Sequence, residues 1–225
     1  MKTYSEAKIF LNEGKKVLYC GTPCQIAGLK NFLKKDYDNL YTLDLVCHGV
    51  PSYKVFRKYL EELPTLKSYS FRDKEFVGWM TSTTYTTEIG EKISIDMKDD
   101  PYWKGFIPNL FLRKSCSDCE FASLERVSDI TLGDFWGIEL YREDLADTKG
   151  TSLVTLNSQK GEFLFNKIEK KLITHKNIPI VNACKKNWYL YKPYKSHPER
   201  NFFFNNFKYQ SFSKLVNTAL TNKCD

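Results

Sequence analysis

The fold is decided by residues 17–28, which read Val17-Leu18-Tyr19-Cys20-Gly21-Thr22-Pro23-Cys24-Gln25-Ile26-Ala27-Gly28. The stretch begins as a short apolar run, which predicts a buried strand. The apolar pattern then breaks at Gly21, and Thr22 is placed to cap a helix whose first residue is Pro23. Cys24 therefore falls in the first turn of that helix, where unpaired backbone N–H groups and the positive end of the helix dipole favour a thiolate. A strand that delivers a cysteine to the start of a helix is a candidate site for sulfur chemistry.

Length and composition indicate a folded protein with a substantial core. The 225 residues are enough for one large domain or two small ones, and 15% of them are aromatic. The net charge of +7 comes from lysines spread along the chain, often in pairs such as Lys15-Lys16 and Lys185-Lys186. We expect these lysines to form a solvated surface; the alternative is that they attract phosphate-bearing cofactors or an acidic protein partner. The chain has no long basic arm, so the composition gives little reason to expect nucleic-acid binding.

The N-terminal sequence and the cysteine count predict the compartment. Residues 1–6 contain no apolar signal region and no segment approaches a membrane span, so we expect a soluble, cytoplasmic protein. Seven cysteines in a reducing compartment do not suggest a disulfide framework. Their odd number indicates instead that a subset of them binds metal or takes part in redox chemistry.

The first part of the chain alternates between helices and strands. In order, the pattern predicts a helix over 4–16, a strand from Val17, a helix ending near Lys35, a strand over 41–47 and a helix over 53–63. The crossover rule makes the two strands a parallel pair. Cys24 and Cys47 then lie at the same carboxyl edge of the sheet, where such folds place their ligands. We therefore predict that the two sulfur atoms are adjacent.

The rest of the chain predicts a mixed α/β class. Residues 67–98 are rich in Thr and Tyr and alternate in polarity, which predicts an antiparallel meander. Further elements are a strand over 129–134, a loop over 147–152, a strand over 153–156 and a helix over 161–171. The sequence shows no internal repeat and no flexible linker. We therefore expect one intertwined α/β unit, with a parallel start and an inserted antiparallel meander.

A second cysteine pair supplies the remaining thiols. Cys116 and Cys119 have the spacing that lets two sulfurs reach one metal around a tight turn. Together with Cys24 and Cys47 they would close a tetrahedral site of four thiolates. Spacing alone does not choose between structural zinc and an iron–sulfur cluster. The alternative is that Cys24 and Cys47 are buried as small hydrophobic residues, as we expect for Cys20.

Five motifs, in order along nearly the whole chain, resemble one family. They are Gly-Thr-Pro-Cys-Gln-Ile-Ala-Gly-Leu at 21–29, Asp-Leu-Val-Cys-His-Gly-Val-Pro-Ser at 44–52, Cys-x-x-Cys at 116–119, Ser-Asp-Ile-Thr-Leu-Gly-Asp-Phe-Trp-Gly at 128–137 and Lys-Gly-Thr-Ser-Leu-Val at 149–154. The chain over 1–225 is similar to the C-terminal domain of the beta subunit of coenzyme F420-reducing hydrogenase and dehydrogenase. This resemblance implies an iron–sulfur flavoprotein oxidoreductase that binds FAD and one [4Fe–4S] cluster. Carried onto this sequence, the cluster ligands are Cys24, Cys47, Cys116 and Cys119.

The flavin contacts are assigned to two loops. Lys149, Gly150, Thr151 and Ser152 combine a cation, a backbone that can approach closely and two hydroxyls, which suits a diphosphate. Gly133, Asp134 and Gly137 are candidates to line the isoalloxazine ring. For both loops, turn chemistry alone is the alternative explanation.

The resemblance also implies partners. Relatives usually carry an upstream ferredoxin-like domain, and this sequence begins after the point where such a domain would end. We therefore expect a ferredoxin-like electron donor or a partner subunit, together with a small-molecule hydride acceptor; the alternative is that this sequence is a fragment or a shortened member of the family. Many bacterial relatives occur where the deazaflavin coenzyme is not expected, so the acceptor is either coenzyme F420 or another organic molecule.

Two other function classes compete with this hypothesis. One is a zinc-stabilised binding domain whose basic, aromatic tail, with Lys192, Tyr194, Lys195, Arg200 and Phe202 to Phe204, contacts nucleic acid. The other is an interaction scaffold that has lost its cofactors. Metal and flavin content distinguish the three.

Overall fold

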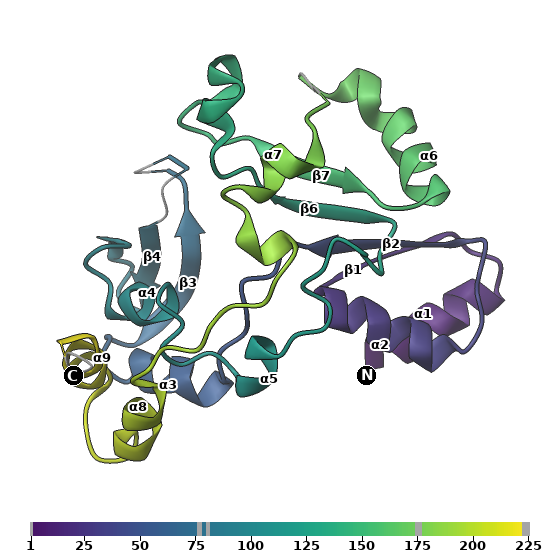
Figure 1. Cartoon of the computed structure of the whole chain (residues 1–225). Helices are drawn as coiled ribbons and strands as arrows, with labels where there is room; N and C mark the ends of the chain where they lie inside the picture. The colour runs from purple at the N-terminus through teal and green to yellow at the C-terminus, as the bar shows by residue number, and fades with distance from the viewer. Residues whose placement is uncertain (1, 76–77, 80–81, 174–176, 222–225) are drawn as a thin grey trace. The chain divides into compact units, whose positions relative to one another are not determined.

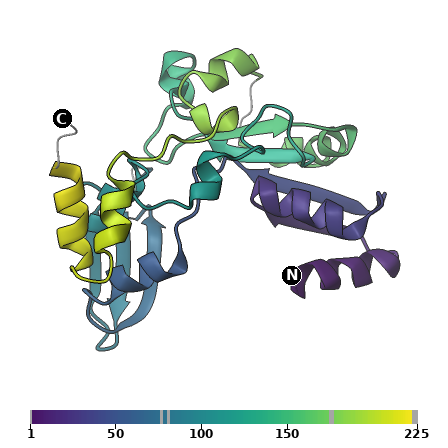
Figure 2. The same cartoon turned by 60° about the horizontal axis from the view of Figure 1, so that its bottom comes forward.

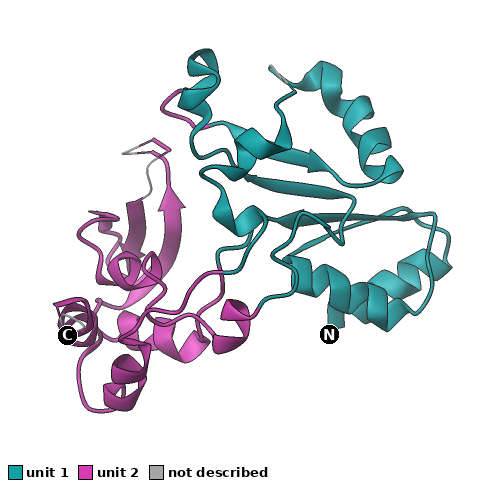
Figure 3. Ribbon diagram, in the orientation of Figure 1, with its two compact units in different colours: residues 1–48, 119–146, 151–193 teal, residues 49–118, 147–150, 194–225 magenta. Residues whose placement is uncertain are grey.

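A computed structural model describes residues 2–75, 78–79, 82–173 and 177–221. The chain forms two compact units whose segments alternate along the sequence (Figure 3): unit 1 contains 1–48, 119–146 and 151–193, and unit 2 contains 49–118, 147–150 and 194–225. The sequence predicted one intertwined unit. The segments do interleave, but they belong to two units. The crossing points lie in ordinary short loops without a linker composition, so the sequence pattern did not reveal them.

Unit 1 is built on a four-stranded sheet. Its strands, in spatial order, are β1 (Val17–Gly21), β2 (Leu40–Leu45), β6 (Ile130–Asp134) and β7 (Ser152–Leu156) (Figure 1). β1, β2 and β6 run parallel, and β7 is antiparallel to β6. The predicted parallel pair is therefore confirmed, and the segments that leave β1, β2 and β6 do so at one carboxyl edge.

Helices α1 (Lys2–Asn12) and α2 (Pro23–Leu33) pack together and against β1 (Figure 2). Their buried residues Ala7, Leu11, Leu29 and Leu33 form a cluster with Leu40 of β2. The helix α2 begins as the sequence predicts, because the Thr22 backbone N–H donates to Gln25 Oε1 at 2.9 Å. It ends at Lys34, which adopts the left-handed conformation with φ of 60°.

The strand β1 is buried on one face only. Val17 and Tyr19 pack against the α1–α2 cluster, whereas Leu18 is 58% exposed and Cys20 is exposed. The prediction of a fully buried strand, with Cys20 in the core, is therefore wrong. Alternate residues of a strand face opposite sides of the sheet, and an apolar run does not reveal that only one side is covered.

The remaining elements of unit 1 follow β6 and β7. They are the 3-10 helices at Ile138–Leu140 (η1), Glu143–Leu145 (η2), Glu169–Lys171 (η3) and Trp188–Leu190 (η4), with α6 (Gln159–Ile168) and α7 (Ile180–Cys184). A second buried cluster is formed by Phe135, Ile138, Leu153, Ala183 and Leu190. This cluster fixes the segment after β6, where several predicted site residues lie.

Unit 2 contains the predicted antiparallel meander. β4 (Ser82–Thr87) pairs with β3 (Leu66–Asp73) on one side and with β5 (Lys92–Asp96) on the other. Its helices are α3 (Tyr53–Leu60), α4 (Pro101–Phe106), α5 (Lys114–Ser117), α8 (Arg200–Asn206) and α9 (Phe212–Thr221). An aromatic core joins Tyr59, Tyr102, Phe111, Phe203 and Phe212. The expected mixed α/β class, with a parallel and an antiparallel part, is confirmed.

Within the described ranges, no helix is both long enough and apolar enough to cross a membrane.

Candidate functional site at the carboxyl edge of the parallel sheet

Two of the predicted cysteines follow equivalent positions of neighbouring strands. Gly21 pairs with Asp44 in the parallel register of β1 and β2. Cys24 lies three residues after Gly21, and Cys47 lies three residues after Asp44. Both segments therefore leave the sheet at the same edge, as the sequence predicts; adjacency of the two sulfurs stays a prediction.

The start of α2 positions Cys24. Its sulfur lies 3.2 Å from the Thr22 hydroxyl, and the residue is exposed. The N–H groups of a first helical turn have no partner inside the helix, so this position suits an anionic ligand group. The sequence therefore places the thiol correctly, and the structure adds the Thr22 hydroxyl as its neighbour.

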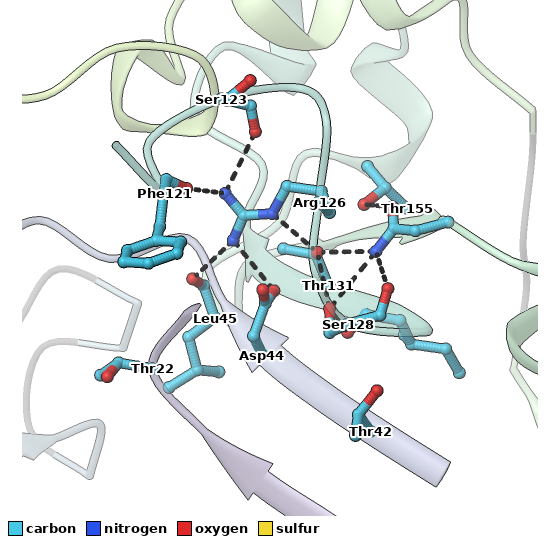
Figure 4. A network of polar contacts seen from close by, with 12 residues as sticks. Thr22, Thr42, Asp44, Leu45, Phe121, Ser123, Arg126, Ser128, Thr131 and Thr155 are labelled. Atoms are coloured by element: carbon cyan, nitrogen blue, oxygen red, sulfur yellow. Dashed lines mark hydrogen bonds and ion pairs between the residues drawn. The ribbon is translucent and has the colours of Figure 1, made fainter. Parts of the chain in front are cut away.

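A buried ion pair lies directly before Cys47. Arg126 Nη2 donates to Asp44 Oδ1 at 2.9 Å and to the Leu45 carbonyl at 3.1 Å (Figure 4). Its Nε donates to Thr131 Oγ1 on β6 at 3.1 Å. The side chains of Arg126 and Asp44 are 2% and 0% exposed. The guanidinium therefore joins the carboxyl end of β2 to the start of its parallel neighbour β6.

The same guanidinium holds the loop that carries Cys119. Arg126 Nη1 donates to the carbonyls of Phe121 and Ser123 at 3.3 and 3.4 Å (Figure 4). Phe121 is two residues after Cys119. Arg126 was not among the residues predicted from the sequence. The signal that could have found it is Asp44, because a carboxylate inside an apolar strand needs a partner.

A second buried carboxylate fixes the loop to the middle of β2. Asp129 Oδ2 accepts from the Thr42 backbone N–H at 2.7 Å and from its hydroxyl at 2.8 Å. Asp129 Oδ1 accepts from the Ser158 hydroxyl at 2.6 Å, and Ser158 caps α6. The 128–137 motif therefore includes a polar residue, Asp129, whose role is to connect β2 to the start of α6.

The four predicted cluster ligands are divided between the two units. Among the described residues, no group of three or more His, Cys, Asp or Glu side chains is arranged to hold a metal ion. Cys24, Cys47 and Cys119 belong to unit 1, and Cys116, in α5, belongs to unit 2. None of the four forms a disulfide with another described cysteine, and Cys224 lies outside the described residues. The ligand set stays a prediction.

Some of the predicted flavin residues are brought together in unit 1. Asp134 of β6 pairs with Ser152 of β7, and the Phe135 N–H donates to the Thr151 carbonyl at 2.9 Å. Because β6 is parallel to β2, these residues lie at the carboxyl edge that also leads to Cys47. Residues from the 128–137 and 149–154 motifs therefore meet on adjacent strands.

The glycines of the predicted flavin loops have local packing roles. A Cβ on Gly133 would lie 2.7 Å from Val46 Cγ2, and Gly137 has φ of +86°. A Cβ on Gly150, where φ is +83°, would lie 2.2 Å from the Trp79 ring. Asp147 Oδ1 accepts from the N–H groups of Lys149 and Gly150, both at 2.9 Å. Turn chemistry, the alternative named above, is therefore present in the 147–150 loop.

Other features of unit 1 were not predicted. Asn187 is 3% exposed; its side chain accepts from the Trp136 N–H at 3.2 Å and donates to the Trp136 carbonyl at 3.1 Å. His48, directly after Cys47, stacks on Tyr189 with a centroid separation of 4.4 Å. No local pattern links these residues, because their contacts join segments far apart in sequence.

The aromatic tail is part of the core of unit 2. Phe203 is fully buried and Tyr194 is 4% exposed. The Tyr194 hydroxyl donates to the Arg113 carbonyl at 2.6 Å, and Arg200 Nε donates to the Leu112 carbonyl at 3.1 Å. Phe203 and Tyr194 are therefore used in packing and cannot stack on bases, as the nucleic-acid alternative would require of them.

Comparison with known protein families identifies the family of this chain. The family model for the C terminus of the coenzyme F420 hydrogenase/dehydrogenase beta subunit matches residues 14–180. The chain belongs to this family. The matched model describes the C-terminal part of that subunit, so the activity of the whole subunit is considered below as a proposal.

The search of curated proteins gives no match. Among solved structures, the chain is similar to a chain of the F420-reducing [NiFe] hydrogenase complex from Methanosarcina barkeri, studied by xenon derivatization. The sequence identity is 14% and the TM-score is 0.41. The alignment covers 92% of the present chain and 58% of the other, so the present chain spans less than two thirds of that relative's length.

Proposed function

We propose that the protein is an iron–sulfur flavoprotein subunit that passes electrons between a [4Fe–4S] cluster and FAD, and on to an organic hydride acceptor. The chain belongs to this family, and the observation that supports the proposal most directly is that several predicted site residues lie at the carboxyl edge of the unit 1 sheet. Segments carrying Cys24, Cys47, Asp134 and Ser152 all adjoin that edge. Open α/β sheets bind ligands at this edge.

The thiols fit the cluster by their chemistry. Iron–sulfur clusters are held by cysteine thiolates, and none of the six described cysteines is in a disulfide with another of them. The proposed ligands are Cys24, Cys47, Cys116 and Cys119. Each of the four is exposed or half-buried, so the sulfurs are not committed to a packed core. When bound, the cluster and the flavin supply one-electron transfer and its conversion to two-electron hydride chemistry.

The protein's own residues prepare the site. The first turn of α2 presents backbone N–H groups beside Cys24, and donors of this kind tune the sulfur ligands of a cluster. Lys149 is exposed and offers a cation for a diphosphate, with the Ser152 hydroxyl nearby in sequence. Asp134 and Gly137 would then lie by the isoalloxazine ring with Gly133. A ferredoxin-like protein or a partner subunit would supply or accept the electrons.

Anaerobic reconstitution with iron, sulfide and FAD tests this function. We expect about four iron atoms and one flavin per chain, with the visible absorption of a thiolate-bound cluster. Cys116→Ser and Cys24→Ser should each lose at least half of the iron, whereas Cys20→Ser, an exposed cysteine outside the set, should match the wild type.

Three outcomes would overturn the proposal. Unchanged iron content in Cys116→Ser would show that the ligand set is wrong. Zinc bound without flavin would favour a zinc-stabilised binding domain instead, and absence of both after reconstitution would favour a scaffold.

A further inference from the structure

Arg126 uses every hydrogen-bond donor that it has. An arginine side chain carries five N–H donors in a rigid planar fork. Arg126 donates once through Nε, twice through Nη1 and twice through Nη2. Four of the five acceptors are the Asp44 carboxylate and three backbone carbonyls. A saturated, buried guanidinium of this kind fixes the relative positions of the segments it joins.

The segment that it fixes has no regular structure of its own. Residues 119–129 are described throughout and contain no helix or strand. The bonds to Phe121 and Ser123 attach the start of this loop to the guanidinium, and the bonds to Asp44 and Leu45 attach the guanidinium to β2. Arg126 therefore links the backbone two residues after Cys119 to the backbone two residues before Cys47.

We propose that Arg126 is a positioning residue that holds the loop after Cys119 in register with the end of β2, and so presents Cys119 and Cys47 to one ligand. The inference rests on the proposed function for the identity of that ligand, a [4Fe–4S] cluster. A lysine could not replace Arg126, because a single ammonium has three donors around one atom and cannot reach acceptors on both sides of the loop.

The carboxylate of Asp44 neutralises the positive charge of Arg126. Its Oδ1 accepts from Arg126, while its Oδ2 is buried without a hydrogen-bond partner among the described residues. Removing only one member of a buried pair leaves an uncompensated charge, whereas replacing both with neutral residues is far better tolerated. The double variant Arg126→Met/Asp44→Asn therefore removes the anchoring bonds and keeps the interior neutral.

Hydrogen exchange of the apoprotein measures the anchoring without any cofactor. In Arg126→Met/Asp44→Asn we expect the amides of residues 119–126 to exchange about tenfold faster or more, while amides of β3 to β5 are unchanged. Arg126→Lys should give a smaller acceleration, since part of the charge-assisted bonding survives. Arg142→Met, which removes an exposed pair with Asp144, is the matched control and should leave residues 119–126 unaffected.

Iron content after anaerobic reconstitution gives the second readout. The double variant should bind less than half of the wild-type iron, with Arg142→Met at the wild-type level. Wild-type exchange rates over 119–126 in both Arg126 variants would overturn the positioning role. Faster exchange together with full iron in both the double variant and Cys119→Ser would instead overturn the ligand set, and with it the proposed function.

Discussion

At the scale of single residues, buried carboxylates organise unit 1. Asp44 and Asp129 are 0% and 8% exposed, and each joins a strand to the loop between Cys119 and β6. Asp129 lies in the Ser-Asp-Ile-Thr-Leu-Gly-Asp stretch that carries part of the family resemblance. The structure shows that this acidic residue has an architectural role, because its two oxygens accept from β2 and from the cap of α6.

Replacing Asp129 should therefore destabilise the fold. We expect Asp129→Ala to lower the free energy of unfolding by about 3 kcal/mol, because the buried donors of Thr42 and Ser158 lose a charged acceptor. Asp129→Asn keeps one acceptor oxygen and should cost about 1 kcal/mol. Urea denaturation measures both values. Asp36→Ala, at an exposed aspartate, is the control, and an equal effect in Asp129→Ala and Asp36→Ala would contradict this role.

At the scale of elements, a buried carboxylate in unit 2 lies near tyrosine side chains that come from two helices and a strand. Asp100 caps α4 and is fully buried; its Oδ1 accepts from the Tyr102 N–H at 2.7 Å and its Oδ2 from the Tyr59 hydroxyl at 3.2 Å. Burial and the nearby Asp100 charge raise the pKa of Tyr69, on β3, to about 12. Burial likewise raises the pKa values of Tyr59 and Tyr102.

These shifts predict a loss of stability in alkali. The pKa of a tyrosine in an unfolded chain is about 10. Between pH 10 and the folded-state value of about 12 for Tyr69, the unfolded state has released a proton that the folded state still holds. The contribution of Tyr69 is therefore complete below pH 10 and is lost as the pH rises through this window. Urea midpoints between pH 9 and 11.5 measure the effect.

The variant Tyr69→Phe separates this contribution from that of the lysines, which also titrate in alkali. Its urea midpoint should fall less steeply with pH than that of the wild type. Parallel slopes for the two proteins would show that Tyr69 ionises equally well in the folded and unfolded states.

At the scale of the whole molecule, the order of segments along the chain does not follow the order of the units. Unit 2 is assembled from residues 49–118, 147–150 and 194–225, and its aromatic core draws Phe111 and Phe203 from different segments. Unit 1 has its own two clusters. Each unit therefore has an independent source of burial energy.

A core deletion in unit 2 should loosen all of its segments together. Phe203→Ala removes a fully buried ring and should cost about 3–5 kcal/mol. We expect amide exchange to accelerate in α3, α4 and α9 at once, although these helices are far apart in sequence. The exposed Ile89→Ala change is the control. Acceleration confined to residues near 203 would contradict the assignment of these segments to one cooperative core.

The sequence by itself determined the local elements and their direction. An apolar run, a Gly-Thr-Pro break and a cysteine at a helix start predicted β1, α2 and the position of Cys24, and the crossover rule then gave the parallel pair and the shared edge with Cys47. These features depend on neighbouring residues and on chirality, so a single stretch contains the information. Only the tertiary structure decided that one face of β1 is exposed, that Phe203 and Tyr194 are core, and that Arg126 pairs with Asp44. Each of these features depends on contacts between segments that are far apart in sequence. Those contacts, and not any local pattern, decide which residues are buried.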